Sequence, residues 1–337
     1  MSDYPIIALR KNDKRLYRQI EAFLKDAGIS FDHNLDYTCV MLDAENNVIA
    51  TGSCYGNTLR CLAVQISHQG ENLLGDIISH LIENRFEKGI THLFVYTKIN
   101  AAGLLKYLGF YEITRVENTM VFMENRPHGF SSWLDHLPEA ETDSAAIVMN
   151  ANPFTNGHLY LLENAAASFP LVHLFLVSED KSVFPYCIRR ELVQKSISHL
   201  ENVILHDCGP YMISQATFPS YFLKDENDVI QSHAALDVNI FIRIAEKLHI
   251  KARYVGEEPF SPTTALYNET MLRLLPPHHI ECHIIPRLKI DGIAVSASAV
   301  RKALANNDIE TVKKLVPSPV YTYLSSIDIK EILQNAL

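Results

Sequence analysis

Apolar residues in the second half of the chain alternate between two spacings. Short apolar runs bounded by polar residues have the length of buried strands, and between them apolar residues recur every three or four positions, as in helices. Strands buried on both faces and separated by helices predict a Rossmann-like, doubly wound parallel sheet of the α/β class. The expected strands are 145–149, 171–177, 203–205, 252–255 and 283–285.

The first half of the chain has a different order of elements. A helical spacing over 13–27 is followed by two strand-like runs, 37–42 and 48–53, on either side of the turn signal Glu45-Asn46-Asn47. A second amphipathic helix includes residues 74–82. Further strands are expected at 58–66, 92–97 and 119–123. This mixture predicts an α+β domain.

Residues 131–143 break both patterns, because they combine Pro138 with Glu139, Glu141 and Asp143. The 337 residues are enough for two domains of ordinary size. We therefore predict a first domain over 1–130, a linker over 131–143 and a second domain over 144–337.

Composition narrows the class of protein. The formal net charge of −9 speaks against binding of nucleic acid in bulk. The six cysteines form no Cys-x-x-Cys pair and no zinc-type spacing, so no resident protein-bound metal is expected. No apolar run reaches the ~18 residues of a membrane span, and the first residues do not resemble a signal peptide. A cytoplasmic protein without membrane partners is expected.

The first expected strand of the second half runs directly into Asn150–His158. Ligands of doubly wound sheets bind beyond the carboxyl ends of the strands. Gly157 permits close backbone approach, and His158 falls in the first turn of the next helix, where free N–H groups and the helix dipole favour a phosphate. A histidine there can stabilise charge while an α-phosphate is attacked. The alternative is an ordinary turn with a satisfied histidine.

A second candidate motif, Val295–Lys302, precedes another helical run. Ser296 or Ser298 can cap that helix and present donors to a phosphate. Arg301, one turn further on, can reach the β- and γ-phosphates. The alternative is an ordinary serine cap followed by basic residues that face solvent.

The two motifs together resemble those of the nucleotidylyltransferase superfamily, through Thr155, Gly157 and His158 and then Ser296, Ser298 and Arg301. With the stretches 178–189, 253–268 and 285–287, the resemblance becomes specific for the citrate lyase ligase family and covers essentially the whole chain. That resemblance implies a ligase that uses Mg²⁺-ATP and acetate. The acetyl group passes through acetyl-AMP to the thiol of a coenzyme-A-like prosthetic group on the acyl carrier subunit of citrate lyase.

The resemblance also implies roles for individual residues. Expected catalytic residues are His158, Thr155 and Arg301. Expected ATP-binding residues are Asn152, Gly157, His158, Lys181, Arg189, Gly256, Glu257, Ser296, Ser298 and Arg301. Alternatives remain for three of them: Lys181 as a solvated loop lysine, Arg189 in a helix-start ion pair and Glu257 as an exposed acid after a turn. The pattern does not locate the acetate pocket.

The first half resembles acetyl-coenzyme-A-dependent N-acetyltransferases, through Asn100, Ala101 and Tyr107–Phe110. Its phosphate loop departs from the family pattern, with Ser67 at the Gln/Arg position and Asn72 at the second glycine. We expect this domain to hold the prosthetic arm through Gln69, Gly70, Asn72, Asn100 and Tyr107. Tyr107 is either a proton donor to a thiolate or a buried packing residue, and the alternative for the whole domain is a relic that only packs.

Two rival functions remain open. One is a nucleotidylyltransferase that joins AMP to a phosphorylated small molecule and carries a fused acetyltransferase domain. The other is a nucleotide sensor without turnover, which the presence of Thr155, His158, Ser298 and Arg301 disfavours.

Overall fold

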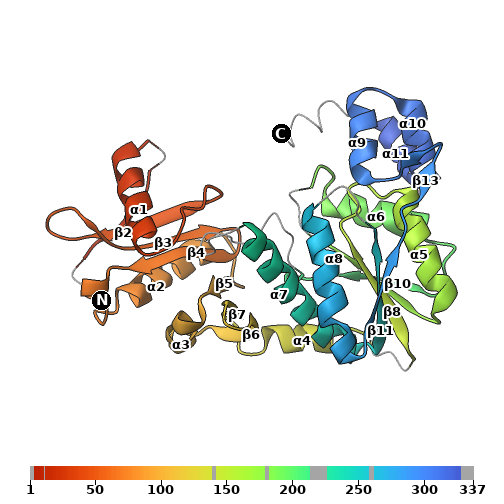
Figure 1. Ribbon diagram of the computed structural model, residues 1–337. Coiled ribbons are helices and arrows are strands. Elements are labelled where there is room, and N and C mark those ends of the chain that lie inside the picture. Colours follow the sequence, from red (N-terminus) through yellow and green to blue (C-terminus); the bar gives the residue numbers. More distant parts are fainter. Residues whose placement is uncertain are drawn as a thin grey trace. The chain divides into compact units, whose positions relative to one another are not determined.

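The computed structural model describes residues 4–10, 12–138, 142–178, 182–212, 226–257 and 262–327 (Figure 1). The described residues of Met1–Ser132 and Thr217–Leu236 form one compact unit, and those of Trp133–Ala216 and Asp237–Leu337 form a second. Each unit is built around its own sheet, so the predicted α/β class is confirmed. The sequence had placed 217–236 in the second domain, and the limits of the functional domains stay a prediction.

The first unit contains a seven-stranded sheet in the order β1-β2-β3-β4-β5-β7-β6. Its neighbouring strands are antiparallel except β4 and β5, which pair in parallel through only two residue pairs, Thr58↔Phe94 and Leu59↔Val95. The strands are β1 (Ile6–Ala8), β2 (Tyr37–Leu42), β3 (Val48–Tyr55), β4 (Thr58–Val64), β5 (Phe94–Thr97), β6 (Tyr111–Val116) and β7 (Met120–Glu124). The helices are α1 (Lys14–Asp26), α2 (Leu73–Phe86) and α3 (Ile99–Tyr107).

Two strands of this sheet were not predicted from the sequence. β1 is only three residues long, too short to show an alternating pattern. β6 has a single buried residue, Ile113, so its sequence lacks the apolar positions that reveal a half-buried strand.

The second unit contains a five-stranded sheet in the order β10-β9-β8-β11-β12, and all of its neighbouring strands are parallel. This confirms the predicted doubly wound sheet. The strand order reverses between β8 and β11, and in open parallel sheets such a reversal opens a crevice at the carboxyl ends of the strands. The strands are β8 (Ser144–Met149), β9 (Val172–Leu176), β10 (Val203–Asp207), β11 (Ile250–Gly256) and β12 (Glu281–Ile285).

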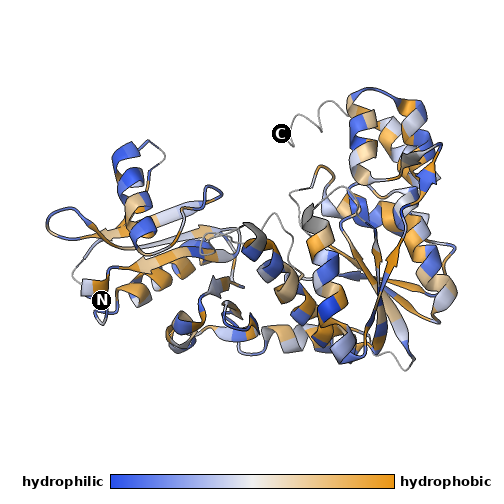
Figure 2. Cartoon of the chain, viewed as in Figure 1, coloured by the Kyte–Doolittle hydropathy of each residue, from blue (hydrophilic) through white to orange (hydrophobic). Residues whose placement is uncertain are grey.

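The helices and a short hairpin complete the second half of the chain. Figure 2 shows the strands of the parallel sheet as strongly hydrophobic, and Ile147 and Leu174 in its centre are fully buried. No helix among the described residues is long and apolar enough to span a membrane. The helices are α4 (Gly129–Asp135), α5 (Asn156–Ser168), α6 (Tyr186–Ser196), α7 (Glu226–Lys247), α8 (Pro262–Leu274), α9 (Ala297–Ala305), α10 (Ile309–Leu315) and α11 (Ser318–Ser326). The hairpin, which was not predicted, pairs β13 (Lys289–Ile290) with β14 (Ile293–Ala294).

Candidate active site

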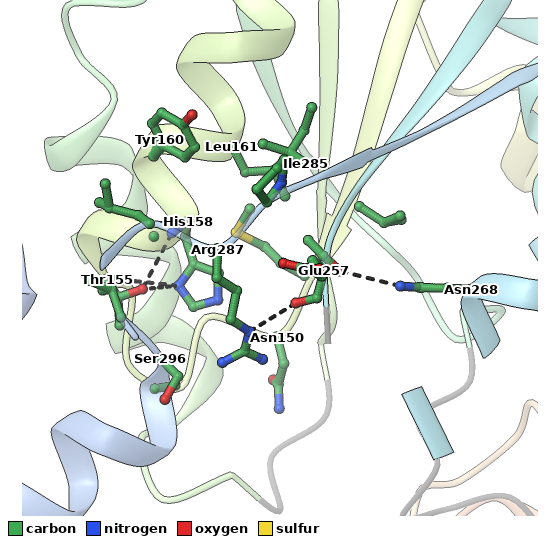
Figure 3. A pocket seen from close by; sticks show the side chains of 18 of the residues that line it. Asn150, Thr155, His158, Tyr160, Leu161, Glu257, Asn268, Ile285, Arg287 and Ser296 are labelled. Atoms are coloured by element: carbon green, nitrogen blue, oxygen red, sulfur yellow. Dashed lines mark hydrogen bonds between the residues drawn. The ribbon is translucent and has the colours of Figure 1, made fainter. Parts of the chain in front are cut away.

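A cavity of about 730 Å³ lies at the carboxyl ends of β8, β11 and β12 in the second unit (Figure 3). Its walls come from these strand ends, from the beginnings of α5 and α9, from α8 and from the segment that follows β12. The cavity therefore occupies the crevice that the strand order predicts. Both sequence motifs contribute to its lining, through Thr155, Gly157 and His158 and through Ser296, Ser298 and Arg301.

Thr155 and His158 form a reciprocal cap at the start of α5. The Thr155 hydroxyl accepts a hydrogen bond from the His158 backbone N–H at 3.3 Å, and the Thr155 backbone N–H donates to His158 Nδ1 at 3.0 Å. Because a backbone amide always donates, Nδ1 must be an acceptor, and the proton of the neutral ring is on Nε2. The cap thus fixes both the position and the tautomer of His158.

Burial and the nearby positive charge of Arg287 lower the pKa of His158 to about 4. The imidazole is therefore neutral at physiological pH and offers one donor, Nε2–H. Figure 3 shows the ring between Thr155 and the side chain of Arg287. A neutral donor in this position can hydrogen-bond an anion without first being ionised.

Gly157 brings the two motifs into contact. A Cβ atom at this position would lie 3.0 Å from the backbone oxygen of Val295, so any larger residue would push the two segments apart. Arg301 makes a second link, because its Nη1 donates to the backbone oxygen of Asn152 at 2.5 Å. The sequence predicted that Gly157 lets the backbone approach a ligand closely, and the close neighbour in the structure is the backbone of Val295.

Ser296 caps α9, and its hydroxyl accepts a hydrogen bond from the Ala299 N–H at 3.1 Å. The hydroxyls of Ser296 and Ser298 are 3.0 Å apart, and both residues line the cavity. The beginnings of α5 and α9 therefore border the same space. Each presents the free N–H groups of a helix N-terminus, which favour an anion.

Three guanidinium groups line the cavity, those of Arg253, Arg287 and Arg301. Arg301 is half-buried, and its desolvation lowers the pKa of the guanidinium, which nevertheless stays charged. Arg287 Nε donates to the backbone oxygen of Glu257 at 2.8 Å. Arg287 was missed as a site residue, although its place directly after strand β12 is a signal for one. The described lining contains a single carboxylate, Glu257, so the cavity suits an anionic ligand.

Gly256 and Glu257, at the end of β11, are two of the residues expected to bind ATP, and both line the cavity. No atom lies within 4 Å of the position that a Cβ at Gly256 would take, so the glycine leaves space there. Asn268 Nδ2 donates to the Gly256 oxygen at 3.3 Å and ties α8 to the end of β11. The described residues contain no group of three or more metal-ligating side chains.

Two residues that the sequence predicted to bind ATP, Arg189 and Asn152, do not line the described cavity. Arg189 is only 1% exposed, and it donates to the backbone oxygens of Phe184, Asn150 and Val177 at 2.7–3.0 Å. It is absent from the described cavity lining and holds the loops after β8 and β9 together. The Asn152 side chain likewise accepts from the Phe184 N–H at 3.1 Å. Lys181 lies outside the described residues.

The predicted arm-binding residues of the first unit lie on its surface. Gly70 (φ +99°) and Asn72 (φ +60°) adopt left-handed conformations in the loop before α2, and Gln69 and Asn100 are exposed. Tyr107 is 85% exposed. The alternative role of Tyr107 as a buried packing residue is therefore wrong.

The fold and the cavity define a class: an α/β protein with a Rossmann-like sheet and, at its carboxyl edge, a cavity whose lining suits an anion. A family model described as the citrate lyase ligase C-terminal domain matches residues 144–324. The chain belongs to the citrate lyase ligase family. The family predicted from the sequence is thus confirmed, and with it the class of enzyme, a ligase.

Two curated relatives are similar over nearly their whole length. The [citrate [pro-3S]-lyase] ligase of Escherichia coli K12 is 36% identical over 330 residues, which cover 95% of this chain and 93% of that protein. The protein of the same name from Klebsiella pneumoniae is 35% identical over 325 residues, or 94% of each chain. A crystal structure of a GNAT-family acetyltransferase from Staphylococcus aureus covers 36% of this chain and 99% of its own, with 16% identity and a TM-score of 0.31.

Proposed function

We propose that this protein acetylates the prosthetic-group thiol of the citrate lyase acyl carrier subunit, using acetate and ATP. The observation that carries the proposal is the convergence of His158 Nε2–H, two helix N-termini and three guanidinium groups on one cavity, in a chain of the citrate lyase ligase family. The volume of about 730 Å³, and a lining with more hydrogen-bond donors than carboxylates, fit a nucleoside triphosphate.

The proposed reaction has two steps. An acetate oxygen attacks the α-phosphorus of ATP, the bond to the bridging oxygen of the β-phosphate breaks, and pyrophosphate leaves. The acceptor thiolate then attacks the acetyl carbonyl of acetyl-AMP, AMP leaves, and the proton of the thiol is released to solvent. Atoms and charges balance without any further reactant.

Each residue of the cavity has its own role in the proposed first step. The Nε2–H of His158 donates to an α-phosphate oxygen and stabilises the charge that grows there during attack. Ser298 and Arg301, with Arg287, hold the departing pyrophosphate. Thr155 acts through His158, because its hydroxyl and backbone N–H fix the ring.

Magnesium fits the proposal through Glu257, the one carboxylate of the described lining, which can bind either the ion or the ribose. The ion would neutralise part of the charge on the phosphates. The surrounding side chains orient the nucleotide and keep the acetate oxygen in line with the α-phosphorus.

The first unit is the proposed holder of the coenzyme-A-like arm. Its loop 65–72 leads into α2 through two exposed residues with positive φ, Gly70 and Asn72. An arm with phosphate groups would be held by backbone N–H groups of this loop, together with Gln69 and Asn100. The exposed hydroxyl of Tyr107 is placed to exchange a proton with solvent.

ATP–pyrophosphate exchange with purified protein tests the proposed adenylation. We expect exchange only when acetate is present, and AMP formation only when a thiol acceptor is added. Exchange that ignores acetate, or an adenylylated phosphate ester as product, would replace the proposal by the rival nucleotidylyltransferase function.

A fragment that begins near Asp143 tests the division of labour. We expect it to keep acetate-dependent exchange and to lose acetyl transfer to the lyase thiol. In the full chain, replacing Gly70 and Asn72 with bulkier residues should slow only the transfer. A fragment that acetylates the lyase as fast as the full chain would show that the first unit does not hold the arm.

A further inference from the structure

Arg253 has a buried side-chain nitrogen, Nε, that lacks a hydrogen-bond partner among the described residues. The other described arginines of the second unit have no such nitrogen. It lies on β11 and is only 4% exposed. Among the described residues, no group accepts a hydrogen bond from its Nε. The guanidinium carbon instead lies 4.2 Å from the centre of the Phe241 ring. The residue also lines the candidate active-site cavity.

A buried guanidinium normally has a carboxylate or several carbonyl oxygens around it, because removing its charge from water is costly. The contact with Phe241 offsets only part of that cost, since an aromatic face attracts a cation but accepts no strong hydrogen bond. The remaining donors require an acceptor. The side facing the cavity is where a ligand can supply one.

Asp237 is a buried acid whose charge, like that of Arg253, acts on Tyr267, and it is already engaged. Its carboxylate accepts a hydrogen bond from the Tyr267 hydroxyl, and no ion pair joins it to Arg253 within the described part of the chain. Burial, and then the charge of Asp237, raise the pKa of Tyr267 well above its usual range, so the hydroxyl keeps its proton. Arg253 therefore stays available for a ligand.

The position of Arg253 separates it from the groups assigned to the phosphates. Arg287 and Arg301 come from segments beyond the strand ends, whereas Arg253 lies within β11, three residues before the strand ends at Gly256. The cavity lining around this strand includes the apolar side chains of Val148, Val255 and Met271. One positive charge beside apolar groups matches a small monovalent anion with a hydrocarbon end.

We propose that Arg253 binds the carboxylate of the small-acid substrate, through its planar row of N–H donors, and so forms the acetate subsite. The inference rests on the proposed function, because it assigns a role within that reaction. Fork-shaped pairing of guanidinium and carboxylate fixes orientation as well as position. One acetate oxygen is then held for attack while the methyl group lies against the apolar wall.

Three variants test the subsite. Arg253→Met removes the charge, Arg253→Lys keeps the charge but lacks the fork, and Lys251→Met removes an exposed charge from the same strand as a matched control. Acetate KM is measured by pyrophosphate exchange, ATP affinity by calorimetry without acetate, and acetate binding by NMR line broadening of ¹³C-labelled acetate.

For Arg253→Met we expect acetate KM to rise about 100-fold, the loss of two charge-assisted hydrogen bonds, with the Kd for ATP changed less than about 3-fold. Arg253→Lys should lie between this variant and wild type. Line broadening of labelled acetate should vanish in Arg253→Met, and Lys251→Met should match wild type in every measurement. In a fourth variant, Arg253→Ala, which leaves space for the ion, added guanidinium should lower the acetate KM.

The outcomes separate this inference from the proposed function. If wild type shows no acetate-dependent exchange, the proposed function fails, while Arg253-dependent line broadening would still support a carboxylate subsite. If wild-type exchange depends on acetate but Arg253→Met keeps a normal acetate KM, the inference is overturned and the function stands. An equal loss of ATP affinity would also overturn it, since Arg253 would then hold a phosphate. Should Arg253→Met fail to fold, Arg253→Lys carries the same comparison.

Discussion

Arg189 and Arg253 are both buried in the second unit, on opposite sides of the central strand β8, but they differ in their hydrogen bonds. Arg189 donates to three backbone oxygens and to the side chain of Asn150, all within 3.0 Å. Arg253 stacks on Phe241, and its Nε has no acceptor among the described residues. The guanidinium of Arg189 is hydrogen-bonded within the fold, whereas the Nε–H of Arg253 is a donor without a described acceptor.

The comparison shows that burial alone does not distinguish a structural arginine from a functional one. A satisfied buried cation contributes to stability, and its removal leaves orphaned carbonyl groups. A buried cation without an acceptor weakens the free protein, and such a cost is typical of binding and catalytic sites. Substitutions at the two positions should therefore act on different quantities.

The largest effect is expected for Arg189→Met. Removing the guanidinium takes one donor from each of the carbonyls of Asn150, Val177 and Phe184, in partly to fully buried contacts worth about 1–3 kcal/mol each, so the free energy of unfolding should fall by about 3–5 kcal/mol. Urea denaturation measures the change. The control is Arg190→Met, which breaks a surface ion pair with Asp207 and should cost less than about 1 kcal/mol. Equal stability of the two variants would contradict the structural role of Arg189.

The next effect concerns the cavity itself. His158→Ala should lower kcat by about 10²–10³ with little change in ATP affinity, because the lost hydrogen bond matters most in the transition state. Arg301→Ala should weaken ATP binding too, since it meets charge present in the ground state. Steady-state kinetics and calorimetry measure both. Near-normal turnover of His158→Ala would reduce the histidine to the satisfied helix cap of the alternative interpretation.

A third prediction uses another buried nitrogen without a described acceptor, His173 Nε2. Burial lowers the pKa of both His173 and its partner His206 to about 4, and their rings are joined by a hydrogen bond of 2.8 Å. Unfolded histidine titrates near 6.5, so only the unfolded chain takes up protons between pH 6.5 and 4. This contribution is therefore fully present well above pH 6.5 and should fall by about 3 kcal/mol for each ring as the pH drops to 4.

Melting temperature as a function of pH measures this loss. The double variant His173→Leu/His206→Leu should lose much of the slope, whereas His278→Leu, at an exposed position, should keep it. A double variant with the wild-type slope would show that other groups cause the acid sensitivity. Unlike Arg253, His173 does not line the described cavity. Its unpaired Nε2 is therefore expected to affect the stability of the fold and not the binding of a ligand in the cavity.

The smallest effect is expected for Arg253→Met in the absence of ligands. Removing a buried charge without an acceptor should leave the free energy of unfolding within about 1 kcal/mol of wild type, or raise it. The same urea denaturation used for Arg189→Met provides the direct comparison. A loss as large as that of Arg189→Met would mean that Arg253 is structural, and the contrast between the two arginines would disappear.

The sequence was sufficient to predict the parallel sheet and the two motifs. Continuous apolar runs such as 171–177 indicate buried strands without knowledge of their neighbours, and Thr155 and Ser296 are typical helix caps. The family followed from these motifs together with the stretches 178–189, 253–268 and 285–287. The roles of individual site residues stay predictions until variants are measured.

Other features depend on contacts that no local pattern contains. The partners of Arg189 come from the ends of two strands and a loop, so its sequence neighbours suggest only a basic helix start. Arg253 interrupts an apolar strand, but only the structure shows that its Nε lacks an acceptor and that Phe241 covers it. β1 and the two strands of the β13–β14 hairpin are too short to show apolar periodicity, and β6 lacks it because only Ile113 is buried.

The contact of Arg301 with Asn152 joins residues 149 positions apart and has a consequence during protein synthesis. At about 5–20 residues per second, a ribosome needs roughly 7–30 s to add that length of chain. Until Val295 and Arg301 have emerged, the start of α5 has neither its neighbour at Gly157 nor its guanidinium link. A nascent chain therefore carries His158 for many seconds before the second motif is there to complete the cavity, and a product truncated before Val295 never completes it.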